Sequence, residues 1–101
     1  MSGVGDGRTG FTALCGNAPN PFRGATDIEY STPARVRVIL TVFDVAGRKV
    51  VTLADGIVEP GSHSVRWDGT GADGSPAPSG VYYVRMAAPG FERTSSMILL
   101  R

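Results

Sequence analysis

The sequence predicts an all-β protein, an antiparallel β-sandwich of about seven strands, with a small barrel as the alternative. Short β-branched and aromatic runs alternate with period 2, and turn-forming residues separate them at short intervals. The chain has 14 Gly and 7 Pro in 101 residues, which suits many strands joined by tight turns. No eleven-residue window combines helical apolar spacing with freedom from Gly, Pro or β-branched runs, so no helix is expected.

The N-terminal part of the sequence divides into an arm and the start of a domain. Residues 1–10 are Gly-rich and polar and are expected to be a flexible N-terminal arm or an expression tail. The folded domain is then 11–101. An apolar run at 11–15 predicts a first edge strand, and the proline-containing segment 17–22, NAPNPF, is expected to have no regular structure.

The next elements are two strands and a hairpin. Alternation at 26–31 predicts a strand. The run at 35–44 predicts a longer one, closed by a turn that extends from Asp44 to Gly47. Gly47 is expected to take a positive φ in a short hairpin loop, after which 48–53 returns as a strand.

A loop at 54–62, with a type II turn at Pro60-Gly61, is expected to precede a strand at 63–67. Trp67 shares a face of that strand with Val65, so it is expected in the core and not as a sugar-stacking platform.

The last third of the chain predicts a long loop and a final hairpin. Residues 68–80 form a thirteen-residue excursion with four Gly and two Pro. A strand follows at 81–86, with Tyr82 facing the core and Tyr83 facing solvent. A turn at Pro89-Gly90 then leads into the last strand, 91–100.

Charge and cysteine content exclude several classes of function. Ten Lys and Arg against nine Asp and Glu give a net charge of +1, which offers no electrostatic basis for binding nucleic acid or an anionic membrane. No apolar run of about 18 residues is present, so no direct membrane insertion is expected. The N-terminus has no signal-peptide pattern, so an export signal would lie elsewhere. Cys15 has no disulfide partner and is expected to be a buried or half-buried apolar residue.

With these residues in view, the chain resembles an Ig-like domain shared by two groups of bacterial proteins. One group carries the C-terminal sorting domain of type IX secretion, and the other consists of flagellar hook-capping proteins. The resemblance covers about 17–101, with Phe43 where Tyr is usual and 23–25 where Asn-Pro-Ser is common. The motif residues that carry it are Asn20, Pro21, Phe22, Asp44, Gly47, Trp67, Asp68, Gly69, Gly80 and Tyr82, followed by a basic residue after an apolar C-terminal run.

The resemblance implies an Ig-like sandwich without activity of its own, the last module of a larger secreted polypeptide. Its protein partners would be the outer-membrane export machinery and a sortase-like peptidase that removes the module and anchors the upstream cargo on the cell surface. The module would reach the surface or the medium through the periplasm. The residues expected to be recognised are Met97, Ile98, Leu99, Leu100 and Arg101. A structural assembly module of the hook-cap kind is the alternative, and a surface- or carbohydrate-binding accessory module is a third class.

The remaining polar motifs give weak indications of chemistry. Asp68 and Asp73, set among glycines, form a weak Ca²⁺ candidate, but the spacing fails the EF-hand pattern and such aspartates usually bond their own turns. His63 is expected to be a solvated strand-end residue, because no nucleophile elbow is present. No phosphate loop or nucleophile–base pair occurs, so neither an enzyme nor a cofactor is expected.

Six arginines lie in or beside the expected strands. Such charges usually mark a solvated sheet face or protect a sheet edge. If several shared one sheet, they would suit an acidic partner. The six are Arg35, Arg37, Arg48, Arg66, Arg85 and Arg93.

Overall fold

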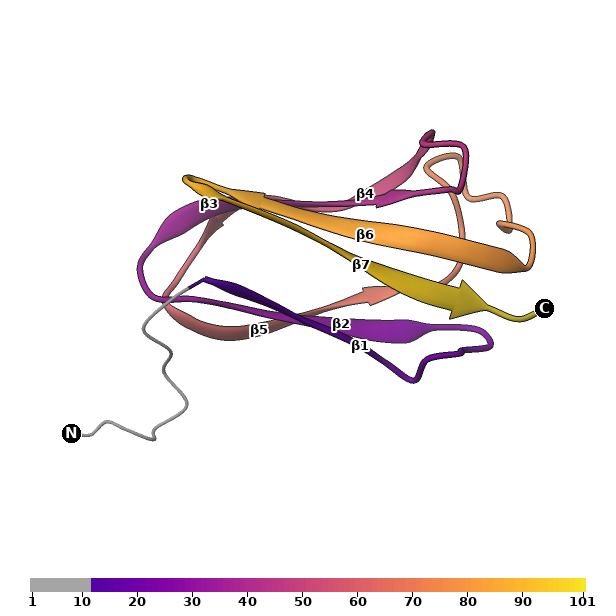
Figure 1. Cartoon of the computed structure of the whole chain (residues 1–101), viewed down its shortest axis with the longest axis horizontal. Coiled ribbons are helices and arrows are strands. Elements are labelled where there is room, and N and C mark those ends of the chain that lie inside the picture. Colours follow the sequence, from indigo (N-terminus) through magenta and orange to yellow (C-terminus); the bar gives the residue numbers. More distant parts are fainter. Residues whose placement is uncertain (1–11) are drawn as a thin grey trace.

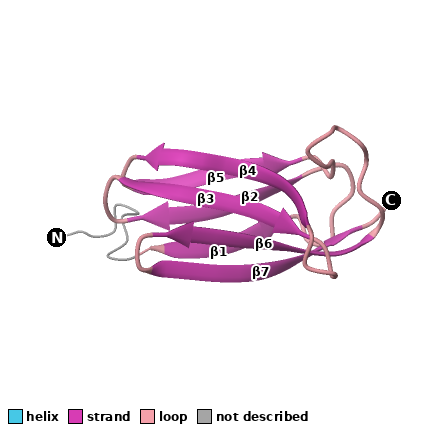
Figure 2. Ribbon diagram, turned by 90° about the horizontal axis from the view of Figure 1, so that it is seen from above, coloured by secondary structure: helices cyan, strands magenta, loops and turns pink. Residues whose placement is uncertain are grey.

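The computed structural model describes residues 12–101, and these form an antiparallel β-sandwich of seven strands in two sheets (Figure 1). One sheet has the order β1-β2-β5 and the other the order β4-β3-β6-β7. Seen from above, the strands of one sheet overlie those of the other (Figure 2). The strands are β1 (Ala13–Ala18), β2 (Thr26–Thr32), β3 (Val36–Phe43), β4 (Lys49–Val58), β5 (Gly61–Trp67), β6 (Gly80–Ala88) and β7 (Phe91–Leu99). The fold class expected from the sequence is therefore confirmed.

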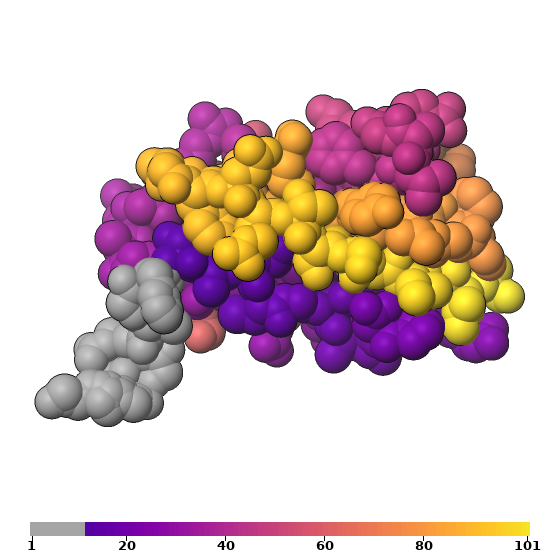
Figure 3. Space-filling model, viewed as in Figure 1, coloured from indigo at the N-terminus to yellow at the C-terminus, as the bar shows by residue number. Residues whose placement is uncertain are grey.

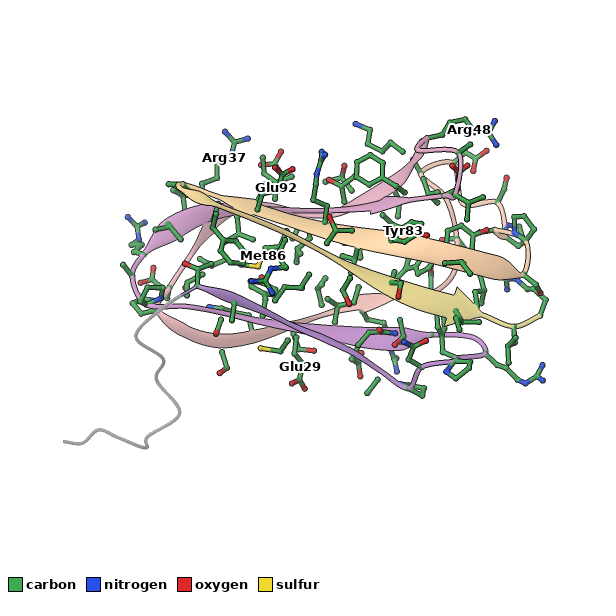
Figure 4. The ribbon with its side chains drawn as sticks, viewed as in Figure 1. Glu29, Arg37, Arg48, Tyr83, Met86 and Glu92 are labelled. Carbon is green, nitrogen blue, oxygen red and sulfur yellow. The ribbon has the colours of Figure 1, made fainter. Side chains whose placement is uncertain are left out.

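Period-2 alternation puts one face of each sheet into a shared core. In β6, Tyr82, Val84 and Met86 are buried, while the residues between them are exposed. Met86 lies between the sheets, whereas Glu29 points away from the core on the far side of the other sheet (Figure 4). The buried apolar set is Phe22, Ile28, Tyr30, Val38, Leu40, Val42, Trp67, Ala77, Tyr82, Val84, Met86, Met97 and Leu99. Burial of a large apolar side chain of this kind contributes about 1.5–3 kcal/mol.

The first strand differs from the expectation in position and in the exposure of its cysteine. The strand expected at 11–15 begins at Ala13, and Asn17 and Ala18, expected to be irregular, pair with β2. Leu14 and Gly16 oppose consecutive residues of β2, so Cys15 is the extra residue of a β-bulge. Its side chain is consequently exposed, and the expected burial was wrong. The arm expected at 1–10 lies outside the described residues.

The fourth strand is longer than expected, because bulges break its alternation. Residues 54–58, expected in a loop, continue β4 and pair with β3. The pairing slips at Leu53 and again at Val50, so neither residue has a partner in the register. These slips interrupt period 2, which is the pattern on which the expected end at residue 53 depended.

The hairpin between β3 and β4 is organised by one carboxylate. Asp44 Oδ1 accepts hydrogen bonds from the amides of Ala46 (2.9 Å) and Arg48 (3.0 Å), and Oδ2 accepts one from the Arg48 guanidinium (3.1 Å). Gly47 has φ 82°, as expected for this position, and its amide bonds the Asp44 carbonyl (3.0 Å). The hydrogen bond from the Arg48 amide is the main cause that lowers the pKa of Asp44, so the carboxylate stays ionised to a lower pH than an ordinary aspartate.

We expect Asp44 to contribute to stability in a pH-dependent way. Because its folded pKa is lowered, its contribution is present above the unfolded pKa of about 3.9 and is lost as pH falls through the folded pKa. Asp44→Asn should therefore be less stable than the wild type near neutral pH, and the two should converge in acid. Urea unfolding between about pH 2 and 7 measures this. Parallel curves over the whole range would contradict it.

Candidate functional site

The five residues expected to be recognised divide between the core and the surface. They form the end of β7 and the two residues after it, on an edge of the four-stranded sheet. Met97 and Leu99 are fully buried, whereas Ile98 is 40% exposed and Leu100 is 37% exposed. The pairing of β7 with β6 has no slip from Phe91 to Leu99. The segment is thus both part of the core and part of the surface.

The segment from Asn20 to Phe22 pairs with the outer edge of β7. The Phe22 amide donates to the Ile98 carbonyl (2.9 Å), and the Leu100 amide donates to the Phe22 carbonyl (2.9 Å). The Asn20 side chain extends this pairing, since its Oδ1 accepts from the Ile98 amide (3.0 Å) and its Nδ2 contacts the Ser96 carbonyl (3.5 Å). Four backbone groups along this edge, which would otherwise lack a partner, are satisfied in this way: the Ser96 and Ile98 carbonyls and the Ile98 and Leu100 amides.

We expect Asn20→Ala to weaken this edge without unfolding the domain. The variant leaves the Ile98 amide without its acceptor, at a cost of about 1 kcal/mol in the free energy of unfolding. Urea unfolding measures the loss, and hydrogen exchange should show faster exchange of the Ile98 amide. Asn20→Asp keeps the acceptor and is the matched control. Equal exchange in both variants would contradict the role given to Asn20.

Three aromatic rings close the core beneath this edge. Trp67, which is 1% exposed, packs edge-to-face against Phe22 (5.6 Å between ring centroids) and against Tyr82 (5.2 Å). The indole N–H donates to the Thr70 carbonyl (2.9 Å), and the Tyr82 hydroxyl donates to the Pro78 carbonyl (2.6 Å). Burial raises the pKa of Tyr82, so this hydroxyl remains a donor. The burial expected for Trp67 is confirmed.

Arg101, two residues after the end of β7, forms hydrogen bonds to the long loop between β5 and β6. Its guanidinium donates to the carbonyls of Ala77 (2.7 Å) and Gly69 (2.5 Å), and its amide donates to Ser79 Oγ (2.7 Å). Gly69 has φ 79°, and a Cβ there would lie 3.0 Å from the guanidinium. A side chain at this position would therefore disturb the contact, which gives the glycine of the Trp-Asp-Gly sequence a physical reason.

Exposed apolar side chains gather beside the end of the strand. Val81 (38% exposed) is the cross-strand partner of Ile98, and Tyr83 (36% exposed) follows on the same face of β6. We call Val81, Tyr83, Ile98 and Leu100 the β6–β7 patch. Strand β7 crosses the face shown in Figure 3, and the chain end lies at the right of that view. Sequence reasoning did not select Val81, although the alternation at 81–86 puts it on the face of Tyr83.

The two aspartates of the Ca²⁺ candidate bond their own turns. Asp68 Oδ1 accepts from the amide (3.1 Å) and the hydroxyl (2.6 Å) of Thr70, and Asp73 Oδ1 accepts from the Ser75 amide (2.9 Å). The Thr70 hydroxyl above all lowers the pKa of Asp68, and the Ser75 amide does the same for Asp73. Among residues 12–101, no group of three or more His, Cys, Asp or Glu side chains is placed to hold a metal ion.

The other polar candidates are dispersed. His63 stacks on Tyr30 (5.3 Å between centroids), and its Nε2 lies 2.6 Å from the Glu59 carbonyl. The arginines occur on both sheets, and five of the six form ion pairs, so they do not make one basic face. The pairs are Arg35–Glu59, Arg37–Asp55, Arg48–Asp44, Arg66–Asp27 and Arg85–Glu92. The described part of the chain contains no apolar helix of membrane-spanning length.

Two solved structures share this fold. Latent dimeric PorU from Porphyromonas gingivalis matches with a TM-score of 0.73 and 20% identity, over 88% of this chain and 9% of PorU. PorZ, described as an essential surface component of the type IX secretion system of the same organism, matches with a TM-score of 0.62 and 24% identity, over 88% of this chain and 12% of PorZ. At these identities the likeness concerns the fold alone.

Sequence comparison gives the family. Over 82 residues the chain is 44% identical to "Basal-body rod modification protein FlgD" of Escherichia coli (strain K12). That match covers 78% of this chain and 36% of FlgD, so the chain spans about a third of the length of this relative. The model of the FlgD Ig-like domain matches residues 19–90. Since this match includes both the Asn20–Phe22 segment and the aromatic cluster, the chain belongs to the FlgD Ig-like domain family.

Proposed function

We propose that this domain is a non-catalytic sorting and surface-anchoring module of a larger secreted bacterial protein, bound by the type IX export machinery. The observation that carries the proposal is the β6–β7 patch, where exposed apolar side chains flank the end of β7. Exposed apolar clusters on a folded domain are typical of protein-binding surfaces. The choice of this system is motivated by PorZ, a protein of the same fold that is described as a surface component of the type IX secretion system.

The β6–β7 patch is rigid before a partner binds, because its backbone is held by hydrogen bonds and by buried neighbouring side chains. Ile98 and Leu100 alternate with fully buried neighbours, and hydrogen bonds to Phe22 and Asn20 hold the backbone between them. A partner that binds this surface has little chain to order on binding, which favours affinity. The module thus acts by being bound, without chemistry of its own.

The test is export of a reporter to which the whole chain is fused at the C-terminus. In a host with a type IX system, a periplasm-targeted fusion should reach the surface or the medium. Ile98→Ser combined with Leu100→Ser should leave the fusion in the periplasm, because both side chains are exposed and belong to the patch. Ile57→Ser, an exposed apolar residue of β4 at 58%, is the matched control and should be exported.

Retention of the unmodified fusion, in a host that exports its own cargo normally, would overturn the sorting proposal. Normal export of the double variant would show that the export machinery does not recognise the β6–β7 patch. Melting curves of the purified variants separate lost recognition from lost folding.

A second candidate function is structural assembly of the hook-cap kind. The observation that favours it is the 44% identity to FlgD, which exceeds the identity to PorU or PorZ. The test replaces the Ig-like domain of Escherichia coli FlgD with residues 12–101 of this chain, so that all seven strands are included. Restored swimming would support an assembly role, whereas a stable but non-motile chimera would count against it.

A further inference from the structure

A cleft lies at the loop end of the sandwich, between the β3–β4 hairpin and the loop that joins β5 to β6. Its volume is about 410 Å³, within the range of ligand pockets. The hairpin contributes residues 44–46 and Arg48, and the loop contributes residues between 71 and 80. Both segments lie at the same end of the sandwich as the C-terminus (Figure 1). Loops at one end of an Ig-like sandwich commonly form binding sites.

The walls of the cleft are fixed before any ligand binds. The Ala72 amide donates to the Val50 carbonyl (3.0 Å), which ties the long loop to the start of β4. Within the loop, the Gly71 amide donates to the Ser75 carbonyl (2.9 Å), and the Ala77 amide donates to the Gly69 carbonyl (2.8 Å). A partner that enters this cleft would not have to order the loops, which lowers the entropic cost of binding.

The lining suits an apolar side chain beside a positive charge. Val45 is 72% exposed at the tip of the hairpin and reaches the cleft together with Val50, Ala77 and two prolines. The charged lining residues are two carboxylates and one guanidinium. The charges of Arg48 and Asp44 cancel in an ion pair, so the lining of the cleft has a net charge of −1, carried by the carboxylate of Asp73.

We propose that this cleft binds a short segment of a partner protein that inserts one bulky apolar side chain and places a neighbouring basic residue near Asp73. An exposed valine contributes little to folding, and in this position it enlarges the contact area available to such a side chain. The inference does not depend on the sorting proposal, because binding is measured on the purified protein.

The test uses the purified full chain and three capped hexapeptides, GSWKSG, GSSKSG and GSWESG, followed by amide chemical shifts. The first peptide should bind with a Kd of about 1 mM or tighter and shift amides within 44–48 and 71–79. Replacing its Trp by Ser, or its Lys by Glu, should weaken binding about tenfold, because each change removes one of the two proposed contacts.

Variants of the protein complete the test. Val45→Ser and Asp73→Asn should each weaken binding of GSWKSG about fivefold. Asn keeps the acceptor for the Ser75 amide, so Asp73→Asn should fold normally. Ile57→Ser and Glu29→Gln, both outside the cleft, are the controls. The proposal is overturned by the absence of saturable shifts up to about 10 mM peptide, by equal binding of GSWESG, or by undiminished binding to the Val45 variant.

Discussion

Removal of residues 97–101 is expected to leave a chain that does not fold cooperatively. Met97 and Leu99 are fully buried, and each contributes about 1.5–3 kcal/mol. The deletion also removes the partners of Asn20 and Phe22 and the contacts of Arg101 with the long loop. The summed loss is comparable with the roughly 5–15 kcal/mol that stabilises a domain.

Circular dichroism on heating measures this loss, and the truncated chain should show no cooperative transition near that of the full chain. Leu100→Ser is the control, because the residue is exposed and its change should shift Tm by only a few degrees. A truncated chain that melts within a few degrees of the intact one would refute the structural role of the segment. In that case the segment would serve only as a binding surface for a partner.

The second large effect is expected from Trp67→Ala, which should lower the free energy of unfolding by about 3–5 kcal/mol. The change opens a cavity between Phe22 and Tyr82, and it leaves the Thr70 carbonyl without the indole donor. Urea unfolding measures the loss, with Tyr83→Ala as an exposed aromatic control.

The fluorescence of the wild type gives an independent check of the same site. Trp67 is the one tryptophan of the chain, so the emission reports this position alone. Emission should be blue-shifted and poorly quenched by iodide, because the indole is 1% exposed. A red-shifted, freely quenched emission would contradict the core position.

Local patterns predicted the strands better than their ends. The alternation at 81–86 gave a strand with Tyr82 inside and Tyr83 outside, as the structure shows. The exposure of Cys15 and the length of β4 were missed, because a bulge shifts side chains between faces without changing composition. Period-2 reasoning depends on unbroken pairing, and it fails wherever a residue is left out of the register.

The candidate site was only partly predictable for a different reason. The C-terminal run was selected as a whole, but which of its residues are exposed depends on the sheet that β7 joins. The bond from Asn20 to the Ile98 amide spans 78 positions, and no local pattern contains such information. The cleft beside Val45 likewise arises because two loops distant in sequence meet at one end of the sandwich.

The pairing of the Asn20–Phe22 segment with β7 has a consequence for biosynthesis. The core is complete only when this early segment pairs with Ile98 and Leu100, so the native domain cannot form until those residues have left the ribosome. Contacts of this sequence separation also form slowly. Any polypeptide that precedes the domain in the same chain therefore has time to fold first, because the domain itself can fold only after its last strand has been translated.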